Sequence, residues 1–110
     1  MQYQALAEQP VSAVVRQVQE LRPYFTVQAG AFEEGKRWSA VNYCNAAAEI
    51  AHRTSRSVVL VGSGRERALC ETIANGLRRD NVVAANVAGK TTLQQLAAVL
   101  VSSDFLLGND

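Results

Sequence analysis

The chain has 110 residues, enough for one domain with its own hydrophobic core, and its 48% hydrophobic and 19% charged residues argue against a disordered segment. Eleven basic and ten acidic residues leave a formal net charge of +1, so we expect no nucleic-acid partner and only a local anion site. No apolar run approaches the roughly 20 residues of a membrane-spanning helix, and the polar N-terminus does not resemble a signal peptide.

The first half of the chain alternates helix, strand and helix. The segment 1–23 is a polar lead followed by a helix, because apolar residues recur at helical spacing until Pro23 ends the pattern. The apolar run 24–29 then predicts a buried strand. A second helix pattern begins at Ser39, which suits an N-cap, and continues through residue 51.

The second half continues the alternation. Its clearest strand is 57–61 (Ser-Val-Val-Leu-Val), which is β-branched and is followed by a Gly-Ser-Gly turn. A helix, a weaker strand, a helix and a short strand are then expected at 65–79, 82–87, 92–101 and 105–107. In the helix 92–101 we expect four residues to face inward: Leu93, Leu96, Ala97 and Leu100.

This alternation of apolar strands with helices predicts an α/β fold: a Rossmann-like parallel sheet in the order 3-2-1-4, with helices on both faces. The sequence stops at Asp110, shortly after the fourth strand and before any helix that would cover it. We therefore expect residues 1–110 to form a single, partial Rossmann-like domain of a longer protein. Apolar surface near the last strand and helix should then favour self-association.

The two cysteines, Cys44 and Cys70, each lie in an alanine-rich helical pattern, and neither has a partner at metal-ligand spacing. This favours buried free thiols in a reducing cytoplasm. We expect no metal site, no cofactor and a cytoplasmic location. His52 lacks a paired nucleophile or carboxylate motif and receives no role.

Two glycine-containing runs imitate nucleotide-binding motifs. The run 62–67 (Gly-Ser-Gly-Arg-Glu-Arg) has Arg67 at the third glycine position of a dinucleotide fingerprint, so its glycines more simply allow a turn from strand to helix. The helix dipole by itself explains an acidic residue such as Glu66 in a first turn. The run 89–91 (Gly-Lys-Thr) resembles the end of a P-loop, but the position five residues earlier is Ala84. Here a turn glycine followed by a capping Thr91 or Thr92 is the simpler interpretation.

The polar loop after the first strand is the most informative segment. It carries Gly30-Ala31 and then Lys36-Arg37-Trp38 before the next helix. Ligands of α/β proteins bind at the carboxyl ends of the strands, where such a basic pair can meet an anion. The pattern resembles the donor-binding domain of the lipopolysaccharide heptosyltransferases, glycosyltransferase family 9.

Further landmarks follow in the order in which that family has them. They are Val58–Ser63, Glu66, the run 86–93 (Asn-Val-Ala-Gly-Lys-Thr-Thr-Leu) and Gly108–Asp110. The run 86–93 is similar to the family's Asn-Leu-Ala-Gly-(Lys/Arg/Glu)-Thr-Ser-Leu segment. The resemblance covers about residues 27–110, and five segments in register make it fairly specific.

The resemblance implies the GT-B architecture, in which two Rossmann-like domains face each other across a cleft and the C-terminal one binds ADP-heptose. By position, Lys36 resembles the lysine near the donor phosphates, where it would stabilise charge in the transition state. Glu66 resembles the acid that contacts the ribose, the Thr91-Thr92 loop the one beside the adenine, and Asp110 the aspartate at the sugar. The full-length protein would then transfer heptose to the lipopolysaccharide inner core, peripherally at the inner face of the bacterial inner membrane.

Two parts of the family's pattern are absent from the given sequence. The family's Asn-Asp pair continues into a Thr/Ser-Gly-x-x-His segment that holds the donor phosphates, and a separate N-terminal domain carries the acceptor and the catalytic base. We therefore expect this piece alone to be inactive. The alternative hypothesis is a non-catalytic Rossmann-like module for nucleotide binding or protein interaction.

Overall fold

The structure, a computed structural model, describes residues 11–29 and 39–108. Four parallel strands form one sheet in the order β3-β2-β1-β4. Their bounds are Tyr24–Gln28 (β1), Ser57–Val61 (β2), Ala84–Asn86 (β3) and Leu106–Gly108 (β4). The predicted order 3-2-1-4 and the parallel α/β fold are confirmed.

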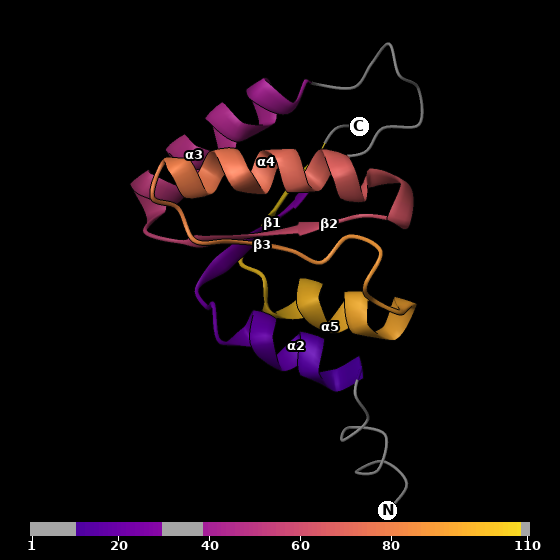
Figure 1. Cartoon of the computed structure of the whole chain (residues 1–110). Coiled ribbons are helices and arrows are strands. Elements are labelled where there is room, and N and C mark those ends of the chain that lie inside the picture. Colours follow the sequence, from indigo (N-terminus) through magenta and orange to yellow (C-terminus); the bar gives the residue numbers. More distant parts are fainter. Residues whose placement is uncertain (1–10, 30–38, 109–110) are drawn as a thin grey trace, which may run out of the picture.

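Helices cover both faces of the sheet (Figure 1). Helices α3 (Ala40–Thr54) and α4 (Arg67–Arg79) lie on one face, and α2 (Val11–Gln19) and α5 (Leu93–Ser102) lie on the other. Within the described residues, no helix is both long enough and apolar enough to cross a membrane.

Alternating residues of β1 and β2 fill two separate cores, as strands buried on both faces require. Phe25, Val58 and Leu60 pack on the α3–α4 side, where the core includes Tyr43 and Ile73. On the opposite side a second core contains Tyr24, Val59 and Val61 of the sheet, with Val18 of α2 and Val99 of α5. The sheet is therefore sandwiched between two apolar layers.

Local signals explain where the helices begin and end. Ser39 caps α3 as predicted, its Oγ accepting from the backbone N–H of Asn42 at 3.2 Å. Ser55 ends that helix in the left-handed conformation, with φ of 55°. Thr92 caps α5: its Oγ1 accepts from the N–H of Gln95, whose Oε1 accepts from the N–H of Thr92. This reciprocal pair is a capping box.

The predicted inward face of α5 is wrong for three of its four residues. Leu93 is 84% exposed, and Ala97 and Leu100 are also exposed, whereas Leu96 does pack on the core. The buried residues of the helix are Gln95 and Val99. A helix that is apolar around most of its circumference does not reveal its inward face by periodicity.

Candidate functional site

The predicted site residues fall into two groups. Lys36 and Asp110, together with the Gly30-Ala31 and Lys36-Arg37-Trp38 segments, lie outside the described residues. Glu66, Thr91 and Thr92 are described. Glu66 follows β2 and the threonines follow β3, and these strands are parallel neighbours, so both loops lie at the carboxyl edge of the sheet.

The turn after β2 is built around Ser63 and Glu66. The backbone N–H of Ser63 donates to Glu66 Oε1 at 2.8 Å, and the N–H of Glu66 donates to the Ser63 carbonyl at 3.1 Å. Ser63 Oγ accepts from the N–H of Arg65 at 3.3 Å. This capping box starts the short 3-10 helix η2 (Gly64–Glu66) that leads into α4. The Glu66 side chain is half-buried and bent back over its own turn.

The loop after β3 is tied to that turn by the backbone. The N–H of Val87 donates to the Leu60 carbonyl at 2.9 Å, and the N–H of Gly89 donates to the Gly62 carbonyl at 2.9 Å. These two bonds continue the pairing of β2 with β3 beyond the ends of the strands. Half-buried Thr91 and the cap Thr92 follow directly after the segment that is bonded to this turn.

Asn86 lies at the root of this loop and links it to α4. Its side-chain N–H groups donate to Glu71 Oε1 at 2.9 Å and to the Arg67 carbonyl at 3.2 Å, and its Oδ1 accepts from the N–H of Ala88. The Asn86 hydrogen bond, helped by one from Arg78, lowers the pKa of Glu71. The family-like asparagine is therefore a structural residue that fixes where the loop leaves β3.

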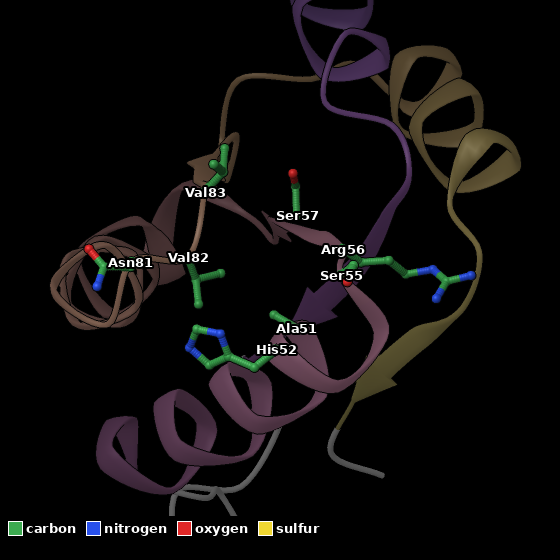
Figure 2. Close-up of a pocket in the computed structure, with 8 residues that line it drawn as sticks. All are labelled: Ala51, His52, Ser55, Arg56, Ser57, Asn81, Val82 and Val83. Carbon is green, nitrogen blue, oxygen red and sulfur yellow. The ribbon is translucent and has the colours of Figure 1, made fainter.

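A hollow of about 280 Å³ lies at the opposite, amino edge of the sheet (Figure 2). It is lined by Ala51, His52, Ser55, Arg56, Ser57, Asn81, Val82 and Val83. The Arg56 side chain extends away from the other lining residues and pairs with Asp104 at 2.6 Å, while His52 Nε2 lies 3.0 Å from the Asp80 carbonyl oxygen. These two basic side chains of the hollow thus contact neighbouring segments of the chain, and His52 is exposed.

Neither cysteine is poised for chemistry. Both thiols are free, Cys70 fully buried and Cys44 partly buried. Burial raises the pKa of the Cys70 thiol to about 11 and also raises that of Cys44, so both are protonated near neutral pH. Within residues 11–29 and 39–108, no three His, Cys, Asp or Glu side chains gather in a way that could hold a metal ion.

Comparison with known proteins gives a consistent result. The model of glycosyltransferase family 9 (heptosyltransferase) matches residues 1–110. Lipooligosaccharide heptosyltransferase 2 of Campylobacter jejuni is 29% identical over 80 residues, which are 72% of this chain and 25% of that protein.

Two solved structures share the fold. The structure of E. coli ADP-heptose lps heptosyltransferase II is 26% identical, with a TM-score of 0.76 over 91% of this chain and 31% of that one. A family 9 glycosyl transferase from Veillonella parvula is 18% identical, with a TM-score of 0.68 over 93% of this chain and 30% of that one.

The chain therefore spans about a quarter of the curated relatives that it matches and under a third of the solved structures. Its fold corresponds to part of a GT-B heptosyltransferase. Since the family model matches from the first residue to the last, the chain belongs to glycosyltransferase family 9, the heptosyltransferase family.

Proposed function

We propose that this chain supplies part of the donor site of an enzyme that transfers heptose from ADP-heptose to the lipopolysaccharide inner core. The family and the heptosyltransferases among its relatives support the reaction class. One structural observation carries the assignment of the site. The turn with Glu66 and the loop with Thr91 and Thr92 are bonded to each other at the carboxyl edge of adjacent strands, where α/β proteins bind nucleotides.

Each residue has a role that its chemistry allows. The Glu66 carboxylate accepts hydrogen bonds from the ribose hydroxyls, and the Thr91-Thr92 backbone borders the adenine. Lys36 offsets the charge that grows on the ADP diphosphate as it leaves, and Asp110 accepts hydrogen bonds from the sugar. Lys36 and Asp110 are proposed from their sequence positions alone.

In the full-length enzyme, an acceptor hydroxyl attacks the anomeric carbon of the heptose. A base outside this chain takes the hydroxyl proton, a new carbon–oxygen bond forms, and the bond to the diphosphate breaks with inversion. ADP leaves carrying the bonding electron pair. The chain described here contributes donor binding and charge stabilisation, so we expect it to show no transferase activity alone.

Titration of the isotopically labelled chain with ADP, followed by NMR, tests the location of the site. We expect weak binding, because a diphosphate without its full set of partners gains little from Lys36 alone: exposed ion pairs contribute only about 0–1 kcal/mol. Resonance shifts should nevertheless concentrate at Ser63–Glu66 and Gly89–Thr92. Shifts confined to the hollow around His52, or no shifts at millimolar ADP, would contradict the proposal.

A further inference from the structure

The carboxylate of Glu66 occupies space that only a glycine at position 62 leaves open. A Cβ atom added to Gly62 would lie 2.8 Å from Glu66 Oε1 and 3.3 Å from Glu66 Cβ. Both contacts are closer than side-chain atoms normally approach. The absence of a side chain at residue 62 is therefore what lets the carboxylate bend back to the Ser63 N–H.

This arrangement divides the two carboxylate oxygens between two tasks. Oε1 accepts from the Ser63 N–H at 2.8 Å. The described part of the chain gives the other oxygen, Oε2, no hydrogen-bond donor, and the side chain is only half-buried. An ionised carboxylate has lone pairs for several donors, so Oε2 remains available to a hydroxyl group.

A second glycine contact fixes the turn against the neighbouring loop. Gly89 has φ of 75°, a conformation that favours glycine, and an added Cβ would lie 2.8 Å from the Cα of Gly64. The backbones of the two loops therefore touch directly, next to the hydrogen bond from Gly89 to the Gly62 carbonyl. The distance between Glu66 and the Thr91-Thr92 loop is set by backbone contact instead of by flexible side chains.

We propose that Gly62 is a positioning residue of the donor site, which holds Glu66 so that it selects a ribose over a deoxyribose. This inference rests on the proposed function and deepens it. Gly62 itself does not contact the nucleotide. It leaves space for Glu66 Oε1 to accept the hydrogen bond from the Ser63 N–H, and Oε2 is then held as an acceptor for the ribose hydroxyls. A nucleotide without those hydroxyls leaves that acceptor unpaired.

The chain contains a matched control for testing this role. Gly64 lies two residues away in the same turn, and a Cβ added there meets no atom within 4 Å. Gly62→Ala should displace the Glu66 carboxylate, whereas Gly64→Ala should not. Glu66→Gln provides the complementary change, because its amide oxygen can still accept from Ser63 while its NH2 group replaces the second acceptor oxygen.

The first measurement needs no nucleotide: hydrogen exchange of the Ser63 amide. We expect exchange to accelerate by roughly tenfold in Gly62→Ala, as expected for loss of a hydrogen bond to a charged group. Gly64→Ala should keep the wild-type rate, and Glu66→Gln, whose neutral amide oxygen is a weaker acceptor, should accelerate exchange by less than Gly62→Ala does. If Gly62→Ala does not fold, Glu66→Asp takes its place, since its shorter carboxylate keeps the charge but does not reach Ser63. An unchanged Ser63 rate in the variant that folds overturns the inference.

The second measurement compares the affinities for ADP and 2′,3′-dideoxy-ADP by NMR titration. The wild-type chain and Gly64→Ala should prefer ADP by roughly tenfold, as expected for hydrogen bonds to a charged group. The ratio of the affinities for ADP and 2′,3′-dideoxy-ADP should fall toward one in Gly62→Ala and in Glu66→Gln. Glu66→Asp should show the same fall where it replaces Gly62→Ala. A wild-type preference that survives in Gly62→Ala refutes the positioning role alone. A wild-type chain that lacks the preference refutes the proposed ribose contact as well.

Discussion

The two helical layers bury their apolar residues to very different extents. Helices α3 and α4 each bury four residues against the sheet and against each other. Helix α5 buries only Gln95 and Val99, and it leaves Leu93 and Val101 84% and 85% exposed. The α3–α4 layer is thus well packed against the sheet, whereas α5 leaves large apolar side chains exposed. The two layers lie on opposite faces of the sheet (Figure 1).

The two layers should therefore differ in how strongly substitutions in them affect stability. The α3–α4 layer holds the central strands β1 and β2, and α4 starts directly after the turn that carries Glu66. The α5 layer contributes the cap at Thr92, which ends the second loop of the candidate site. We therefore expect substitutions in the first layer to change the stability of the domain most, and substitutions on the outer face of α5 to change mainly its association.

The largest effect should come from Ile73→Ala, which truncates a side chain that is fully buried between α4 and the sheet. Lost burial plus an unfilled cavity should cost about 2–5 kcal/mol of unfolding free energy. Urea denaturation followed by circular dichroism measures the loss. Leu93→Ala, at an exposed position, is the control and should stay within about 0.5 kcal/mol of wild type. Equal losses in the two variants would contradict the comparison of the layers.

The contact between α3 and α4 can be tested at Gly76. A Cβ added there would lie 2.6 Å from the Sγ of Cys44, so Gly76→Ala should destabilise the chain by about 1–2 kcal/mol despite the better helix propensity of alanine. Adding Cys44→Ala removes the clash and should restore most of the stability. A double-mutant cycle from chemical denaturation gives the coupling. Additive effects would show that the two helices are not in contact at this point.

Removal of the cap of α5 should have an intermediate effect on the free energy of unfolding. Thr92→Ala removes the acceptor for the Gln95 N–H and should cost about 1 kcal/mol, whereas Thr92→Ser keeps it and should cost little. Thermal unfolding of both variants provides the measurement. A Thr92→Ala variant as stable as wild type would mean that the loop after β3 does not depend on this cap.

Substitutions on the outer face of α5 should have the smallest effect on stability and a clear effect on self-association. Replacing Leu93 and Val101 by Ser together should change the unfolding free energy by less than about 0.5 kcal/mol for each site. Leu106 of the edge strand β4 is also 52% exposed. Sedimentation at increasing concentration should show self-association that the double variant reduces. A monodisperse wild-type monomer would contradict this expectation.

Much of the fold could be predicted because its strongest signals are local. Strand β2 was predicted residue for residue, since a β-branched run lies between turn residues. Strand β3 is shorter than predicted, covering Ala84–Asn86 within 82–87, and β4 is displaced by one residue to Leu106–Gly108. Both are edge strands, whose extent depends on the register with a single neighbour.

The site was predictable only in part. The sequence indicated that Glu66 lies in the first turn of a helix, and it lies in η2, which leads into α4. It also indicated that Thr91 or Thr92 caps a helix, and Thr92 is the cap. It did not indicate that Gly62 makes room for Glu66, or that Gly89 touches Gly64. These contacts depend on which loops meet in space, and the two glycines of the second contact are 25 positions apart. The sequence showed only that these residues are glycines and that they permit turns.

Steady-state kinetics of the full-length enzyme with ADP-heptose tests the donor-site assignment most directly. Lys36→Ala should lower kcat more than it raises KM, because the charge on the leaving diphosphate grows toward the transition state. Glu66→Ala should mainly raise KM for the donor, since a ribose contact is the same in the ground and transition states. If both variants keep the wild-type kcat and KM, neither residue belongs to the donor site, and the assignment is wrong.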